Sequence, residues 1–228
     1  MFDFSSITNS WAYILEGVKY TIELTIITAV GGLILGTGLA LCRLSTSKIL
    51  SEFSKLYTNL MRAVPLVLVL FWFFLLMPEV LKVLLRLDHP VMIGAEMTAI
   101  ITFVLFEAAY FAEIMRAGIQ SVDIGQMEAG RSLGLPYWKT MRKIILPQAI
   151  RTMIPSIINQ FIITVKDTSI LSVIGFPELV LAAKNVQAGT FKSFETWTIV
   201  GAMYLIVITI LSYLAKIVER RVNRGVKR

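Results

Sequence analysis

Glu128-Ala129-Gly130-Arg131-Ser132-Leu133-Gly134 is a polar, basic stretch punctuated by glycine, and Ile144-Ile145-Leu146-Pro147 follows it after nine residues. It lies in a chain that otherwise consists mostly of apolar runs long enough to cross a membrane. A helix-forming polar segment between two such runs is exposed to water and offers its side chains to other molecules. We therefore expect a docking surface on a loop outside the bilayer.

On both sides of this stretch the chain is strongly apolar. Of its 228 residues, 56% are hydrophobic and only 16% are charged, too few for the polar surface of a soluble domain of this size. We therefore expect a single integral membrane module. Its one cysteine, Cys42, excludes an internal disulfide framework, and its one histidine, His89, has no companion ligands for a metal site.

Five segments reach the roughly 20 mostly apolar residues that a helix needs to cross about 30 Å of hydrocarbon. The predicted spans are residues 18–42, 64–85, 91–115, 150–174 and 197–218. They leave an outer interfacial segment at 1–17, a long loop at about 120–148 and a basic tail at 219–228. The sequence thus predicts an all-α integral membrane protein with five transmembrane helices.

Most of the basic residues fall on one side of these spans. They lie between the first two spans, between the third and fourth spans including the start of the fourth, and from the end of the fifth span onward: Arg43, Lys48, Lys55, Arg62, Arg116, Arg131, Lys139, Arg142, Lys143, Arg151, Lys216, Arg220, Arg221, Arg224, Lys227 and Arg228. The other side has Lys19, Lys82, Arg86, Lys184 and Lys192. Because cytoplasmic loops are enriched in Lys and Arg, we expect the N-terminus outside and the C-terminus in the cytoplasm. The net charge of +7 then faces anionic lipid head groups, and a nucleic-acid partner is disfavoured.

The opening stretch has the features of a short helix with a defined end. The pattern predicts a helix over 125–133, with Gly134 in a left-handed C-cap position and Pro136 starting the next segment. It also predicts a second short helix over 137–143 and a turn at Pro147 into the fourth span. From the spacing alone, a solvated loop without a partner is the alternative.

The spacing resembles the coupling loop of binding-protein-dependent ABC import permeases, which follows the pattern EAA-x3-G-x9-I-x-LP. Gly130 stands where the third residue of that pattern is usually Ala, which predicts a looser helix because glycine costs about 1 kcal/mol of helix propensity. Further stretches resemble the polar amino-acid permeases of this family: Arg62-Ala63-Val64-Pro65-Leu66, residues 109–119, Leu146-Pro147-Gln148-Ala149 and Lys166-Asp167-Thr168-Ser169. Together these matches cover about residues 15–220. Three other stretches in combination most resemble glutamate/aspartate permease subunits: Phe106–Tyr110, the short opening Met1–Ile7 and Trp72–Pro78.

The resemblance implies a type I ABC permease fold with cytoplasmic coupling helices, in a multi-pass subunit of the bacterial cytoplasmic (inner) membrane. The implied ATPase-coupling residues are Gln126, Glu128, Ala129, Gly130, Arg131, Ser132, Leu133 and Gly134. The implied partners are a cytoplasmic ABC ATPase dimer, a second permease subunit, identical or related, and an extracytoplasmic amino-acid-binding protein.

The expected activity is import of polar amino acids, glutamate or aspartate first, with glutamine, histidine and arginine as alternatives. The chain has no Walker-type nucleotide site and no catalytic constellation. We therefore expect that it binds no cofactor and that ATP and Mg²⁺ are used by the partner ATPase.

Ionisable and polar side chains inside the predicted spans are candidates for a translocation path. They are Glu107, Asn159, Lys166, Asp167, Thr168 and Ser169. Glu96 and Glu107 are eleven residues apart and share one face of the third span. For Glu107 and Lys166, a purely structural pairing role is the alternative. Gly32 and Gly36 have the small-xxx-small spacing that allows close helix approach.

A different class of protein also fits part of the pattern. In an ion-coupled secondary transporter or a channel, Glu107 and Lys166 would be the coupling groups and no ATPase would be needed. Secondary transporters often carry inverted internal repeats, and five spans without a repeat disfavour that class. A membrane enzyme is disfavoured by the missing catalytic set.

Overall fold

The computed structural model describes residues 9–223. Within this range, five helical stretches are long and apolar enough to cross a membrane: Trp11–Arg43, Leu66–Leu85, Ala95–Gln120, Tyr137–Ile174 and Ser193–Arg221. The predicted all-α architecture with five spans is confirmed. The predicted bilayer limits, including the interfacial segment 1–17 and the tail 219–228, stay predictions. Residues 1–8 and 224–228 of these two segments lie outside the described range.

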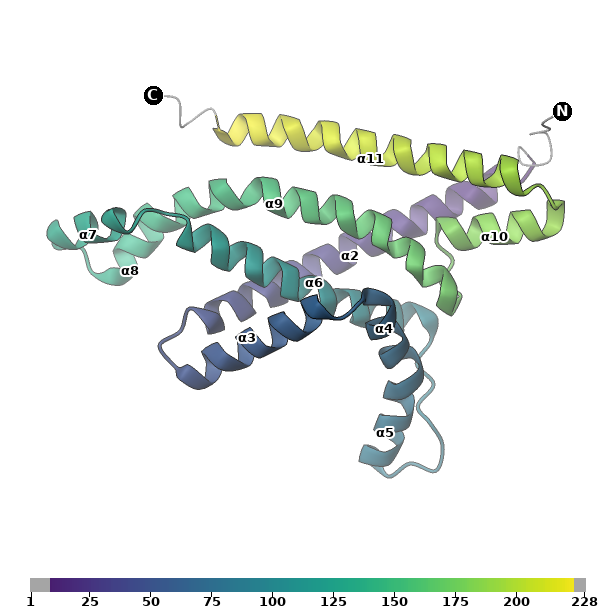
Figure 1. The fold of residues 1–228 in the computed structure, drawn as a ribbon, viewed down its shortest axis with the longest axis horizontal. Helices are drawn as coiled ribbons and strands as arrows, with labels where there is room; N and C mark the ends of the chain where they lie inside the picture. Colours follow the sequence, from purple (N-terminus) through teal and green to yellow (C-terminus); the bar gives the residue numbers. More distant parts are fainter. Residues whose placement is uncertain (1–8, 224–228) are drawn as a thin grey trace.

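Four long helices run along the long axis of the molecule (Figure 1): α2 (Trp11–Arg43), α6 (Ala95–Gln120), α9 (Leu146–Asp167) and α11 (Ser193–Asn223). Helices α2 and α6 form the tightest seam. A Cβ atom on Gly36 would lie 2.8 Å from the carbonyl oxygen of Ala108 and 2.9 Å from the backbone nitrogen of Ala112. The predicted close approach at Gly32 and Gly36 is confirmed, because only glycine leaves room for the α6 backbone.

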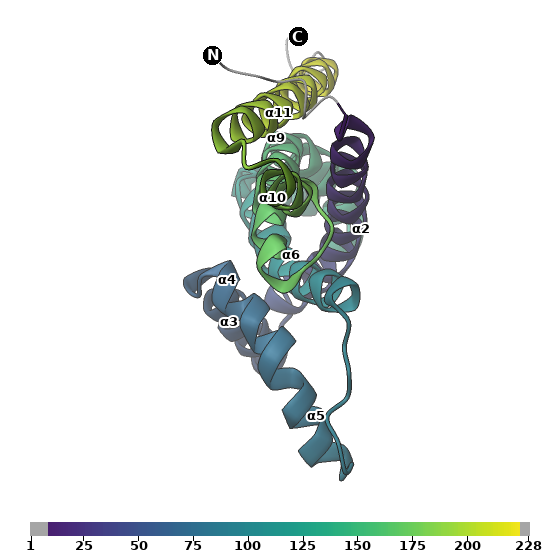
Figure 2. The same ribbon diagram turned by 90° about the vertical axis from the view of Figure 1, so that its right-hand side faces the viewer.

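The two ends of the bundle differ. Helices α7 (Ile124–Ser132) and α8 (Tyr137–Thr140), the turn after α2 and the C-terminal end of α11 lie at one end. Helix α10 (Leu179–Thr190) and the start of α2 lie at the other (Figures 1 and 2). The basic segments that the sequence places on one side therefore share one end. That this end faces the cytoplasm stays a prediction.

The connection after α2 is a packed helix, α3 (Lys48–Ala63). Polar residues of α3 face the bundle, where Ser54 Oγ donates to the carbonyl oxygen of Leu39 at 2.7 Å and Tyr57 Oη donates to that of Leu105 at 2.8 Å. Burial raises the pKa of the Tyr57 phenol to about 12, so the donor keeps its proton. The large apolar side chains of α3 point outward instead: Ile49, Phe53, Leu56 and Leu60.

The second predicted span is helical but leaves the bundle. It consists of α4 (Leu66–Phe71), a π-helical turn (Trp72–Leu76) and α5 (Met77–Leu85), which together project away from the long helices (Figures 1 and 2). Leu66, Val69 and Leu70 of α4 are buried, whereas the π-helical turn and α5 bury none of their residues. This arm packs against the rest of the chain through α4 and through Phe73 and Phe74 of the π-helical turn, whereas α5 projects away.

The fourth span is one long helical run that begins earlier than the sequence predicts. Helix α8 passes through a π-helical turn (Met141–Ile145) into α9, and a 3-10 turn (Thr168–Ile174) ends the run. The predictions of a separate helix over 137–143 and of a turn at Pro147 are wrong. Pro147 follows the π-helical turn, where the backbone hydrogen-bond ladder is already shifted, so a residue without an N–H is tolerated.

Glu178 stabilises the end of the bundle that α10 and the start of α2 form, a role that the sequence did not predict. Its fully buried carboxylate accepts hydrogen bonds from the backbone N–H groups of Val180 at 2.7 Å and Leu181 at 2.8 Å, which caps α10. The hydroxyl of Tyr204 on α11 lies 3.4 Å away. Burial outweighs these hydrogen bonds and raises the pKa of Glu178 to about 7.

The raised pKa predicts a pH-dependent stability. Since the folded state holds the Glu178 proton more tightly than the unfolded chain, the stabilisation is complete below about pH 4.5 and is lost as pH rises through about 7. Thermal unfolding in detergent between pH 5 and 8 measures this loss. Glu178→Gln flattens the profile, whereas Glu79→Gln, at an exposed site, leaves the wild-type profile unchanged. Equal slopes in wild type and Glu178→Gln would contradict the assignment.

Candidate functional site

Helix α7 is defined by its caps. At its start, Asp123 Oδ1 accepts a hydrogen bond from the backbone N–H of Gly125 at 2.7 Å. At its end, Gly134 has φ +74°, so the predicted left-handed C-cap is confirmed. The backbone N–H of Leu135 then donates to the carbonyl oxygen of Gly130 at 3.0 Å, and the chain reverses into α8.

The predicted coupling residues form an exposed surface at this end of the bundle. Apart from Gly130 they are all exposed: Gln126, Glu128, Ala129, Arg131, Ser132, Leu133 and Gly134. Large apolar side chains lie exposed among them, with Ile124 75%, Leu133 79% and Trp138 67% accessible. We call the exposed side chains of residues 124–139 the coupling surface. Its mixture of apolar, aromatic and charged groups is typical of protein interfaces.

Gly130 is buried against α8. A Cβ atom on this residue would lie 2.4 Å from Thr140 Cγ2, so the glycine lets the two helices pack directly. The expectation of a looser helix missed this role, because helix propensity describes an isolated helix and not its packing. A second tie joins α7 to α9, where Gln148 Nε2 lies 3.4 Å from Gln126 Oε1.

A cluster of three arginines surrounds Glu113 on α6. Its carboxylate is hydrogen-bonded by Arg116 and lies 3.6 Å from Arg43 Nη1 and 3.8 Å from Arg62 Nη1. The Arg62 guanidinium also lies over the Tyr110 ring, 5.6 Å from its centroid. The cluster joins α2, α3 and α6 and carries an excess of positive charge. The sequence did not predict this cluster, although the i, i+3 spacing of Glu113 and Arg116 was a usable signal for their ion pair.

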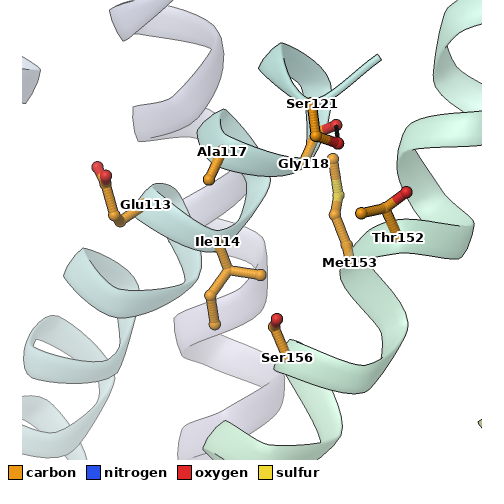
Figure 3. A pocket seen from close by; sticks show the side chains of 8 residues that line it. All are labelled: Glu113, Ile114, Ala117, Gly118, Ser121, Thr152, Met153 and Ser156. Atoms are coloured by element: carbon orange, nitrogen blue, oxygen red, sulfur yellow. Dashed lines mark hydrogen bonds between the residues drawn. The ribbon is translucent and has the colours of Figure 1, made fainter. Parts of the chain in front are cut away.

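A cavity of about 320 Å³ opens between α6 and α9, lined by eight residues that include Glu113, Ala117, Thr152 and Ser156 (Figure 3). Gly118 and Met153 bring the two helices together here, since a Cβ atom on Gly118 would lie 2.2 Å from Met153 Cγ. The cavity therefore adjoins the contact between the two spans that flank the coupling loop.

A polar stripe runs along α9. Its exposed residues are spaced three, four or seven apart and so share one face: Gln148, Thr152, Ser156, Asn159 and Lys166. Of the predicted path residues, Asn159 and Lys166 belong to this stripe, and Asp167 and Ser169 are half-buried next to it. Thr168 is fully buried and donates to the carbonyl oxygen of Val165 at 2.8 Å. It therefore does not line the open face in this structure.

Glu107 is fully buried between three helices. A Cβ atom on Gly32 of α2 would lie 2.7 Å from Glu107 Cβ, so α2 and α6 pack closely here. Glu107 Oε2 accepts a hydrogen bond from Gln160 Nε2 on α9 at 3.1 Å. Lys166 is exposed elsewhere, so Glu107 is an interhelical tie in this structure. Glu96 lies exposed in the first turn of α6. Among residues 9–223, no three His, Cys, Asp or Glu side chains are grouped as metal ligands would be.

Known proteins resemble this chain over nearly its whole length. The glutamate/aspartate import permease protein GltK of Escherichia coli O6:H1 is 38% identical over 220 residues, which cover 96% of this chain and 98% of that protein. The arginine transport system permease protein ArtQ of Bacillus subtilis is 36% identical, covering 97% of both chains. The glutamine transport system permease protein GlnP of Escherichia coli K12 is 34% identical, covering 97% of this chain and 98% of that protein.

A solved structure shares the fold. The crystal structure of an amino acid ABC transporter with histidines has a TM-score of 0.89 and 33% identity, covering 97% of this chain and 99% of its own. This likeness confirms the expected type I permease fold. The model of the family described as binding-protein-dependent transport system inner membrane component matches residues 28–224. The chain belongs to this family of membrane-embedded transport subunits.

Proposed function

We propose that the chain is the permease subunit of an ATP-driven importer of polar amino acids, with glutamate or aspartate as substrate. The observation that carries the proposal is the coupling surface, a capped helix with the family's spacing exposed at one end of the bundle. A surface of this kind suits a protein partner that supplies force. The relatives GltK, ArtQ and GlnP support transport of amino acids.

The coupling surface is the binding site for a cytoplasmic ABC ATPase dimer. ATP and Mg²⁺ are used by that partner, and this chain binds no cofactor. An extracytoplasmic amino-acid-binding protein docks at the opposite end, which α10 and the start of α2 form. Both assignments follow from the proposed orientation, with the basic segments in the cytoplasm.

The polar stripe of α9 faces a second permease subunit, identical or related. Thr152, Asn159 and Lys166 are exposed on a helix that crosses the membrane, and hydrocarbon does not tolerate such groups. A second permease against this face encloses a wet path between the two subunits. Of the predicted path residues, Asn159 and Lys166 then line it, with Asp167 and Ser169 at its edge.

The proposed mechanism needs two arrangements of the same helices. Closure of the ATPase dimer pushes α7, and the motion passes into the spans on either side of it. The cavity between α6 and α9 lies where those spans meet, so its shape changes with their angle. Substrate and ATP shift the populations of an outward-open and an inward-open state.

An acidic substrate fits the charges near the path. Lys166 is exposed on the polar stripe, and the arginines around Glu113 leave that cluster positive, so both sites attract carboxylates. The similarity to GltK favours glutamate or aspartate. Glutamine, arginine and histidine are the alternatives, since ArtQ and GlnP are almost as similar as GltK.

Sealed vesicles that contain the permease and its ATPase test the proposal. With the binding protein outside and ATP inside, we expect labelled glutamate or aspartate to accumulate and unlabelled glutamine to compete poorly. Without ATP, an imposed proton or sodium gradient drives no uptake. Uptake from an ion gradient alone would instead identify a secondary transporter, and preferential glutamine, histidine or arginine uptake would correct the substrate.

The coupling surface predicts two loss-of-transport variants. Glu128→Arg reverses an exposed charge, and Gly134→Val places a β-branched residue at φ +74°. We expect uptake to fall about tenfold or more, because each change disturbs a buried interface by more than about 1.4 kcal/mol. Membrane insertion remains normal, as does uptake by Glu79→Arg, a matched charge reversal on α5. Normal uptake by both coupling variants would refute the docking role.

Lys166 provides the test of the path. Lys166→Gln removes the exposed cation from the polar stripe, and we expect the rate of glutamate uptake to fall about tenfold, as loss of about 1.4 kcal/mol predicts. Binding of the ATPase is unchanged, because Lys166 lies far along α9 from α7. Lys55→Gln, a matched change of an exposed lysine on α3, has no effect. Unaltered uptake by Lys166→Gln would exclude Lys166 from the path.

A further inference from the structure

The contact between Gly130 and Thr140 leaves no space between α7 and α8. Gly130 is the buried residue of α7, and Thr140, the last residue of α8, is fully buried. A Cβ atom on Gly130 would lie 2.4 Å from Thr140 Cγ2 and 2.8 Å from Thr140 Oγ1. Both distances are far below an ordinary van der Waals contact. The two helices therefore touch backbone to side chain.

Rotation of the threonine side chain does not relieve this contact. The three substituents of its Cβ occupy three staggered positions, and two of these positions lie against Gly130. Threonine has only one hydrogen to place among them. At least one heavy γ atom therefore remains against residue 130 in every rotamer. Serine, with a single γ atom, has one rotamer that avoids both positions.

Helix α7 is tied to α8 and α9 more firmly than to α6. Beyond the Gly130 contact, Gln126 meets Gln148 of α9 at 3.4 Å. Helix α8 then continues through the π-helical turn to Ile174. Towards α6, by contrast, α7 is connected by the turn at residues 121–123. A push on α7 is therefore transmitted most directly to α9.

We propose that α7, α8 and α9 move as one lever, locked at the Gly130–Thr140 contact. The lever turns α9 against α6 at the contact between Gly118 and Met153, beside the cavity of Figure 3. Gly130 and Thr140 are positioning residues, because they act through α7 and touch neither substrate nor nucleotide. This inference rests on the proposed function and specifies which span receives the motion.

A rescue series tests the lock in vesicles with the partner ATPase. Gly130→Ala should lower glutamate uptake per ATP hydrolysed about tenfold while binding of the ATPase stays normal, since coupling changes of this size arise from residues that touch neither ligand. Adding Thr140→Ser restores coupling, whereas adding Thr140→Val, which keeps two γ atoms, does not. Gly38→Ala is the matched control, because a Cβ there meets nothing within 4 Å.

Two results would overturn the lock. One is wild-type coupling in Gly130→Ala, and the other is equal rescue by Thr140→Ser and Thr140→Val. Failure of the proposed function is distinguishable, because the wild-type complex itself would then show no ATP-driven uptake. The ratio of uptake to hydrolysis separates lost coupling from lost protein, which lowers both quantities together.

A cross-link tests the lever without disturbing the lock. In a Cys42→Ser background, Gln126→Cys and Gln148→Cys are joined by a short bifunctional thiol reagent. Because both residues lie on surfaces assigned to partners, the comparison is the same double variant treated with a monofunctional thiol reagent, which occupies both positions without joining them. If α7 and α9 belong to one lever, the ratio of uptake to ATP hydrolysis differs by less than about twofold between the joined and the singly blocked protein, a change of less than about one thermal energy unit. A lower ratio in the joined protein alone would show that α7 and α9 move relative to each other, which contradicts the proposal.

Discussion

Polar groups that these helices carry into the bilayer are stabilised by partners inside the protein, and this constraint shapes the bundle. Among the described residues, Thr98 Oγ1, Thr102 Oγ1 and Glu107 Oε1 are buried exceptions without a hydrogen-bond partner. An unpaired hydroxyl in hydrocarbon costs about 2–7 kcal/mol. Thr21, Thr25 and Thr28 of α2 return their hydroxyls to carbonyl oxygens one turn back, at 3.0, 2.7 and 2.8 Å. Each threonine is thus satisfied within its own helix. The buried face of α2 consists mostly of small residues, so other helices can pack closely against it.

The close packing of α2 against α6 follows from these small residues. Gly32 and Gly36 let the α6 backbone approach, and Glu107 is held at the same level by Gln160. The seam is therefore closely packed, with a carboxylate used as a tie between three helices. Polar side chains that do not fit inside lie on the outer face of α9 instead. The proposed path between two subunits therefore runs along that face.

Local signals in the sequence predicted the elements whose causes are local. Apolar length predicted five spans, and Gly134 predicted the end of α7, because a left-handed residue after a polar helix is a strong stop signal. The run through Pro147 was missed, since a π-helical turn has no clear sequence signature. The role of Gly130 was missed because it depends on Thr140, which folding brings near. Glu178 caps α10 through the neighbouring N–H groups of Val180 and Leu181, so a local signal existed, whereas its contact with Tyr204 depends on folding.

The long fourth span connects both ends of the molecule, and this continuity bears on how one end can control the other. Its first turn carries Thr140 beneath the coupling surface, and its last residue, Ile174, is four positions before Glu178, which caps α10. A helix that turns as a unit moves both regions together, so an opening at one end accompanies a closing at the other. Alternating access requires that relation. A break at Pro147, as the sequence suggested, would have separated the push on α7 from the outer end.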